Sequence, residues 1–130
     1  MICLDSDVII DFLHDDDDAI DVLEKYRGEL ATTEINIFEV FDGIYAQKLI
    51  NKEEEMIAGL FFQSIQILSS SSGWGQIAAQ MLSHLKRQGK TIEQTDCFIA
   101  AIMQINGCNK IITRNVKHFS AIKGVEVISY

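Results

Sequence analysis

Short apolar runs alternate with helical patterns along the whole chain, and this alternation limits the possible folds more than any other feature. Strands separated by helices form parallel sheets whose two faces are covered by those helices. We therefore expect an α/β fold, with a twisted parallel sheet of about five strands flanked by helices. The strand-like runs are Ile2–Leu4, Leu30–Thr32, Ile65–Leu68, Lys110–Thr113 and Val125–Ile128.

The segments between these runs have helical periodicity. From Ile37 onward, apolar residues recur at i, i+3, i+4 and i+7, the spacing of one buried helix face. The expected helices are Ala19–Tyr26, Thr33–Ile50, Glu53–Phe62, Gln76–Arg87, Gln94–Ile105 and 116–122. The residues expected at helix ends are Thr33 and Thr95 as N-caps and Gly89 and Gly107 as C-caps.

Length and composition predict one compact unit. The 130 residues contain no proline and no long linker, so we expect residues 1–130 to form a single domain. The three cysteines form no C-x-x-C pair, which favours reduced core thiols over a disulfide or a zinc site. No apolar run approaches the roughly 20 residues of a membrane span. No basic segment precedes a long apolar stretch, so we expect a cytoplasmic protein without membrane contact.

The formal net charge of −8 argues against a protein that holds nucleic acid through bulk positive charge. It does not exclude an enzyme that acts on nucleic acid. Such an enzyme can gather its acids around metal ions, which reverse the local sign of the potential.

Acidic residues stand where apolar segments should bury them. Asp5 and Asp7 interrupt the opening stretch MICLDSDVII, and Glu39 and Asp96 lie in apolar helical patterns. A buried carboxylate is costly without a partner. The carboxyl ends of parallel strands form the edge where open α/β sheets bind ligands, and Asp5 ends the first strand there. Thr113 ends the fourth predicted strand at the same edge, and Asn115 lies two residues later.

Each acid alone has a purely structural explanation. Asp96 would stabilise a helix N-terminus, and Asp7 would begin a turn. Four acids at one edge are harder to explain in this way, because like charges raise one another's pKa unless cations neutralise them. Oxygen ligands suit Mg²⁺ or Mn²⁺ rather than zinc. The pattern therefore predicts a metal-dependent nuclease or phosphatase.

Small residues follow two of these acids by one helical turn. Gly43 lies four residues after Glu39, and Ala100 lies four residues after Asp96. Side chains four apart share a helix face. We expect Gly43 and Ala100 to leave room beside the two carboxylates.

Four segments carry a family resemblance, in the order and at the spacings usual for that family. They are LDSDVIIDFL, TTEINIFEVFDGI, TIEQTDCFIAAIM and IITRNVKHFSAIKGVEVI. In these segments the chain resembles the PIN-domain ribonucleases, and most closely the small VapC-type toxins of prokaryotic toxin–antitoxin pairs. The resemblance extends over essentially the whole chain.

The resemblance implies a PIN fold and Mg²⁺- or Mn²⁺-dependent endoribonuclease activity. On matching positions it implies that Asp5, Glu39 and Asp96 bind the metal, while Thr113 and Asn115 orient the site or bind water, metal or substrate. It also implies a homodimer that is inhibited by a small antitoxin protein, whose tail blocks the active-site groove.

The chain departs from the family pattern at one acid. Many relatives carry a further acid at the position of Asn115 or three residues later, where this chain has His118. Asp7 stands where asparagine is common and is a candidate fourth metal ligand. His118 has two open interpretations: a phosphate contact or proton donor, or a surface histidine of the last helix.

Basic residues near the predicted site are candidates for binding RNA. Arg114 lies between Thr113 and Asn115 and is the best candidate for a phosphate contact, the alternative being a solvated rim residue. Lys117 and Ser6 are further candidate substrate-binding residues. The acidic run Asp15–Asp18 lacks the ligand spacing of a calcium loop and is expected to cap the helix that follows it.

Three other functions remain open. Asp5-x-Asp7 also occurs at the first strand of haloacid-dehalogenase-type phosphatases, but these need a late acid pair, and Glu126 is the only acid after Asp96. The missing fourth acid suggests instead a degenerate PIN-like module that binds a partner without cutting. An RNA-processing PIN nuclease without an antitoxin has the same sequence features as a toxin.

Overall fold

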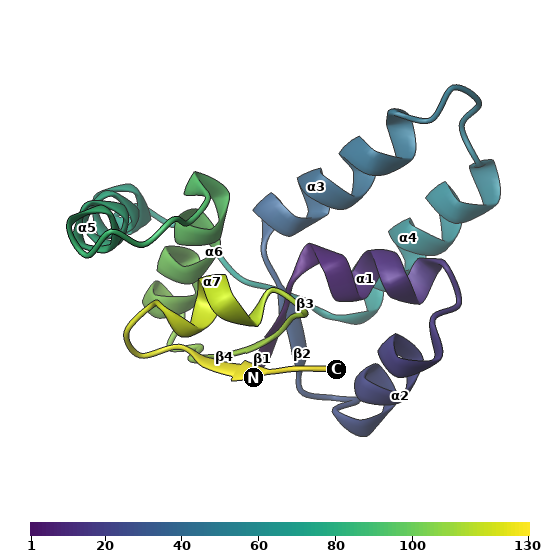
Figure 1. Ribbon diagram of the computed structural model, residues 1–130. Coiled ribbons are helices and arrows are strands. Elements are labelled where there is room, and N and C mark those ends of the chain that lie inside the picture. Colours follow the sequence, from purple (N-terminus) through teal and green to yellow (C-terminus); the bar gives the residue numbers. More distant parts are fainter.

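A five-stranded parallel sheet forms the centre of the computed structural model, which describes residues 1–130 (Figure 1). The strand order is β3-β2-β1-β4-β5, and β1 is therefore the central strand. Cys3 of β1 pairs with Ala31 on one side and Ile111 on the other. The expected α/β fold with a parallel sheet is confirmed. The strands are β1 Ile2–Leu4, β2 Leu30–Thr32, β3 Gln66–Ile67, β4 Lys110–Ile112 and β5 Glu126–Ile128.

Seven helices cover the two faces of the sheet. Figure 1 shows α5 and α6 on one side of the molecule and α1, α2, α3 and α4 on the other. None of the helices has the length and apolar character that a membrane crossing requires. The helices are α1 Ser6–Leu13, α2 Asp17–Lys25, α3 Glu34–Tyr45, α4 Lys52–Ser64, α5 Trp74–Arg87, α6 Gln94–Ile105 and α7 Val116–Ser120.

The sheet separates two hydrophobic cores. Because successive strand residues point to opposite faces, Cys3 joins the core beneath α5 and α6, whereas Ile2 and Leu4 join the core beneath α1 and α2. All three residues of β1 are buried, as expected for a central strand covered on both faces. The carboxyl end of β1 is thereby fixed between its neighbours, and Asp5 follows it directly.

Helix α1 is the element that the sequence patterns did not predict. Its run Val8-Ile9-Ile10 is β-branched and favours a strand by local propensity. In the structure Val8 and Ile9 are buried, and Phe12 and Leu13, one turn later, pack against the same core. Tertiary packing of this helical face outweighs the local preference. The helix ends before Asp15, whose φ of 59° is left-handed.

Most of the expected helix ends are present. Thr33 caps α3 and Asp16 caps α2 through side-chain oxygens that accept from backbone N–H groups. Gly89 and Gly107 follow α5 and α6 with φ of 70° and 69°, which glycine adopts without strain. The N-cap predicted at Thr95 is wrong, because α6 already begins at Gln94. Helix α3 also ends at Tyr45, before the predicted end at Ile50.

Two leucines provide a test of the core. Leu4 is fully buried, whereas Leu49 is 88 % exposed. We expect Leu4→Ala to lower the free energy of unfolding by about 2–5 kcal/mol, since it removes buried methyl groups and leaves a cavity. Leu49→Ala makes the same chemical change at the surface and should stay within about 0.5 kcal/mol. Equal midpoints of the two variants in urea denaturation would contradict this placement of β1.

Candidate active site

Asp5 joins three elements at the carboxyl edge of the sheet. It follows β1, caps α1 and is 7 % exposed. Its Oδ1 accepts hydrogen bonds from the backbone N–H of Ser6 at 2.8 Å and from Nδ2 of Asn36 at 3.3 Å. Its Oδ2 accepts from the hydroxyl of Thr113 at 2.7 Å. The carboxylate of Asp5 is therefore held by α3 and by the end of β4.

Glu39 is tied to Asp5 through two polar side chains. The hydroxyl of Ser6 donates to Oε1 of Glu39 at 2.7 Å, and Nδ2 of Asn36 donates to Oγ of Ser6 at 3.0 Å. Thr33, the N-cap of α3, donates through its own hydroxyl to Oδ1 of Asn36 at 2.6 Å. This chain of bonds fixes the first two turns of α3 against the start of α1.

Asn36 is a site residue that the sequence patterns did not reveal. It is fully buried, and its amide contacts both Asp5 and Ser6. The available signal was a polar amide between Ile35 and Ile37, three residues before Glu39 on the same helix. Without a structure, that position does not distinguish a solvated helix residue from a buried donor.

Asp96 reaches the same edge from the first turn of α6. It is buried, and its Oδ2 lies 2.9 Å from Nδ1 of His118 and 3.5 Å from Nδ2 of Asn115. The backbone N–H of Asn115 in turn donates to the hydroxyl oxygen of Thr113 at 2.9 Å. Asp5, Asp96, Thr113 and Asn115 are thus joined in one hydrogen-bonded group.

Asp7 turns toward the backbone after β4. Its Oδ2 accepts from the N–H of Arg114 at 2.8 Å and lies 3.0 Å from the hydroxyl of Thr113. Its Oδ1 accepts from the N–H of Val8 at 2.7 Å. Both oxygens of Asp7 are therefore engaged within the protein, as both oxygens of Asp5 are, whereas Glu39 and Asp96 each keep one oxygen without a hydrogen bond.

Three candidate substrate contacts have different surroundings. The guanidinium of Arg114 lies 3.0 Å from Asp11 and 3.1 Å from Asp16, and it covers the ring of Tyr130 at 4.3 Å. An RNA phosphate would have to compete with both carboxylates for this guanidinium. Lys117 is exposed on α7. Ser6 is buried, and its hydroxyl donates a hydrogen bond to Glu39 instead of facing a substrate.

The expected role of Gly43 is not supported. A Cβ added to Gly43 would meet nothing within 4 Å. The residue is exposed on α3, so no neighbouring group requires a glycine at this position. The idea that it prevents crowding of Glu39 is therefore wrong.

The acids affect one another electrostatically. Burial, together with the negative charge of Asp7, raises the pKa of Asp5 from 3.8 to about 7 against the opposing effect of its hydrogen bonds. Burial also raises the pKa of Glu39 and of Asp96, and hydrogen bonds from Ser6 and His118 respectively oppose these shifts. No lysine or arginine contacts these three carboxylates; their partners are neutral donors and, beside Asp96, the imidazole of His118.

The donor set fits a hard divalent cation, although the side chains have not converged on one point. Glu39 uses only Oε1 and Asp96 only Oδ2 in hydrogen bonds, which leaves the second oxygen of each available. Nowhere do three His, Cys, Asp or Glu side chains lie together closely enough to hold one ion as they stand. Glu39 is half-buried and has the longest side chain of the three, so it is the carboxylate best able to turn toward Asp5 and Asp96.

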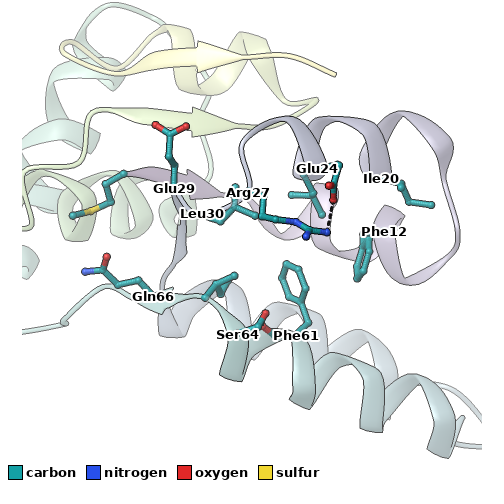
Figure 2. A pocket seen from close by; sticks show the side chains of 13 residues that line it. Phe12, Ile20, Glu24, Arg27, Glu29, Leu30, Phe61, Ser64 and Gln66 are labelled. Atoms are coloured by element: carbon teal, nitrogen blue, oxygen red, sulfur yellow. Dashed lines mark hydrogen bonds and ion pairs between the residues drawn. The ribbon is translucent and has the colours of Figure 1, made fainter.

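A separate cavity of about 670 Å³ lies at the opposite edge of the sheet, beside the amino ends of β2 and β3 (Figure 2). Phe12, Ile20, Leu30 and Phe61 give it an apolar lining. Arg27 lies at the cavity with its guanidinium paired to Glu24 at 2.7 Å. The cavity contains none of the four acids and is better suited to apolar side chains than to a reaction.

The chain matches one family of known proteins and shares its fold with several solved structures. The family described as PIN domain matches residues 2–125. A chain of VapBC2 from Rickettsia felis, in a crystal structure bound to a DNA fragment from the promoter, superposes with a TM-score of 0.86 at 19 % identity. The superposition covers 100 % of this chain and 99 % of that one. No curated protein matches the sequence significantly.

Two further structures have the same fold. A chain of VapBC-1 from nontypeable Haemophilus influenzae has a TM-score of 0.80 at 21 % identity, over 99 % of this chain and 98 % of that one. A chain of a toxin–antitoxin complex from Klebsiella pneumoniae has a TM-score of 0.71 at 25 % identity, over 97 % and 96 %.

The raised pKa of Asp5 predicts how stability depends on pH when no divalent cation is present. The folded protein binds this proton more tightly than the unfolded chain, so the contribution of Asp5 is most favourable below about pH 4. It is lost as the pH rises to about 7. At roughly 1.4 kcal/mol per pKa unit, the loss has an upper limit of about 4 kcal/mol.

In EDTA, the effect of Asp5→Asn on the free energy of unfolding should therefore be more favourable at pH 8 than at pH 4, by roughly 2 kcal/mol. The asparagine oxygen can still accept from Ser6 and Asn36, while the hydroxyl of Thr113 can turn to donate to Asp7. Urea denaturation at both pH values measures the difference. Asp21→Asn, at an exposed position of α2, is the control. If the difference in stability between Asp5→Asn and the wild type does not change with pH, the raised pKa of Asp5 is contradicted.

Proposed function

Because this chain belongs to the PIN domain family, we propose that it is a metal-dependent endoribonuclease and the toxin of a toxin–antitoxin pair. The observation that carries this proposal is the gathering of Asp5, Glu39 and Asp96 at one sheet edge without a lysine or arginine partner. Such a cluster is costly for folding alone. A site that recruits Mg²⁺ or Mn²⁺ for phosphodiester hydrolysis accounts for it.

Each side chain has a role in this proposal. Asp5, Glu39 and Asp96 would hold the cation. A bound divalent cation supplies activation of water and stabilisation of the charge on the phosphate. Thr113 fixes Asp5 through its hydroxyl, and Asn115 lies beside Asp96.

Substrate contacts are proposed for the surface beside this edge. Lys117 is exposed on α7 and free to meet a phosphate, whereas Arg114 would first have to leave Asp11 and Asp16. Few cations lie here, which favours a substrate held mainly through the metal site rather than through bulk charge. RNA is the proposed substrate because of the family resemblance.

Protein partners are proposed for two apolar surfaces. The cavity between α2 and α4 suits the apolar side of a small antitoxin (Figure 2). The exposed large hydrophobic residues of the α3–α4 arm favour a contact with a second copy of the chain, each copy being one PIN domain over residues 1–130. Those arm residues are Phe38, Tyr45, Leu49, Met56 and Leu60.

A binding module without nuclease activity is the second candidate. The observation in its favour is that no three ligand side chains converge on one point. The buried positions of Asp5 and Asp96 argue against it, because binding a partner gives no reason to keep buried acids.

Cleavage of a mixed, structured RNA tests the proposed activity. We expect wild-type protein to cut with Mn²⁺ or Mg²⁺ and to stop cutting in EDTA. Asp96→Asn and Glu39→Gln should each lower the rate by about 10–100-fold or more, because each removes a metal ligand.

Glu34→Gln is the matched control. It makes the same change on the same helix at an exposed position and should leave the rate unchanged. Equal cutting by wild type and Asp96→Asn would identify a contaminating nuclease. Absence of cutting with either metal would favour the binding module.

If a small protein is encoded immediately upstream of this chain, co-expression with it tests the partner. We expect the wild type alone to arrest bacterial growth, and the co-expressed pair to form one complex in size-exclusion chromatography. Asp96→Asn should relieve the arrest and still form the complex, whereas Ile20→Glu should weaken the complex by placing a charge in the apolar cavity. RNA cleavage with neither growth arrest nor a complex would indicate a processing nuclease without an antitoxin.

A further inference from the structure

His118 is the nearest hydrogen-bonding neighbour of Asp96. Its Nδ1 lies 2.9 Å from Oδ2 of Asp96, and Nδ2 of Asn115 lies 2.9 Å from the same ring nitrogen. Both side chains are largely buried, with 26 % of His118 and 9 % of Asp96 exposed. The next residue, Phe119, is fully buried in the core and anchors α7, the helix that carries His118.

The three acids differ in how they are held. Asp5 accepts from Ser6, Asn36 and Thr113, and Glu39 accepts from Ser6. Asp96 has only His118 and the longer contact with Asn115, both on the same oxygen. The orientation of Asp96 therefore depends mainly on the imidazole of His118, whereas the orientation of Asp5 is shared among three partners.

The short contact fixes the position of a proton. A carboxylate oxygen and a bare ring nitrogen would repel each other at 2.9 Å, so one of them carries hydrogen. When the carboxylate of Asp96 serves as a metal ligand, Nδ1–H of His118 is the donor in this contact. With Nδ1–H donating to Oδ2 of Asp96, His118 and the amide of Asn115 both donate to this one oxygen, at 2.9 Å and 3.5 Å.

We propose that His118 is a positioning residue that holds Oδ2 of Asp96 and thereby presents Oδ1 to the divalent cation. The proposal rests on the proposed function, since it needs a cation at this edge. It assigns a role to the residue at which the chain departs from the usual acid pattern. Hydrogen bonds to a metal ligand orient it and raise metal affinity, and their loss typically weakens binding by about 10–100-fold.

Calorimetric titration of the full chain with Mn²⁺ at pH 7.5 tests this role. Asparagine and leucine have nearly the same shape, but asparagine has an N–H donor, Nδ2, bonded to Cγ. This matches histidine, in which Nδ1 is also bonded to Cγ. We expect His118→Leu to weaken Mn²⁺ binding by about 10-fold or more, and His118→Asn to restore most of the affinity. His14→Asn, which changes a histidine beside Glu54, should bind as the wild type does.

The outcomes separate the two proposals. If the wild type binds Mn²⁺, Asp96→Asn binds weakly and His118→Leu binds normally, the positioning role is overturned and the metal site stands. If the wild type and Asp96→Asn bind Mn²⁺ equally or not at all, the metal site itself is overturned.

If His118→Leu does not fold, nitrogen NMR of the wild-type imidazoles tests the proposed role of His118 instead. The chain has three histidines, and His118→Asn identifies the signal of His118 by its loss. At a pH where the ring is neutral, we expect the proton on Nδ1, and Asp96→Asn should shift that signal. A bare Nδ1 with the proton on Nε2 would overturn the proposal.

Discussion

Burial of Asp5 at the end of the central strand is the constraint on which the site depends. Pairing with β2 and β4 fixes the backbone of β1 on both sides, so the carboxylate cannot withdraw toward solvent. Its hydrogen bonds then determine where Asn36 and Thr113 lie. Through Ser6 and Asn115 the same network reaches Glu39 and Asp96. The geometry of the site thus follows from one buried charge and the neutral groups that satisfy it.

No lysine or arginine contacts these acids, and this distinguishes the site from a structural ion-pair network. A buried carboxylate kept for stability is usually paired with arginine or lysine. Here the nearest guanidinium, that of Arg114, is bound by Asp11 and Asp16 and stacked on Tyr130. The negative potential at the edge is therefore left uncompensated by the chain itself. Under the proposed function, a cation from solution would balance this charge, and the acids would lower stability in its absence.

The sheet and its functional edge could be predicted from the sequence, whereas the contacts among side chains could not. Apolar runs with turn residues between them specify strands, and the acids next to those runs mark the carboxyl edge. The pattern failed at α1, where Val8 and Ile9 favour a strand locally and only packing makes them helical. It also failed to reveal Asn36 and the carboxylate partners of Arg114, because sequence spacing does not give the direction of a side chain. The role predicted for Gly43 was wrong for the same reason, because the space around a residue depends on the packing of the whole fold.

Helix starts explain why polar residues of the site gather where they do. In a sheet of parallel strands, each helix that follows a strand begins at the carboxyl edge, and α1, α3 and α7 begin with Asp5, Thr33 and Asn115 as N-caps. Asp96 lies in the first turn of α6. The partial positive charge of helix N-termini favours carboxylates and would also favour a phosphate. The pKa of Asp5 is nevertheless raised, so desolvation and mutual repulsion outweigh these dipoles, and a cation is the contribution that remains to balance the site.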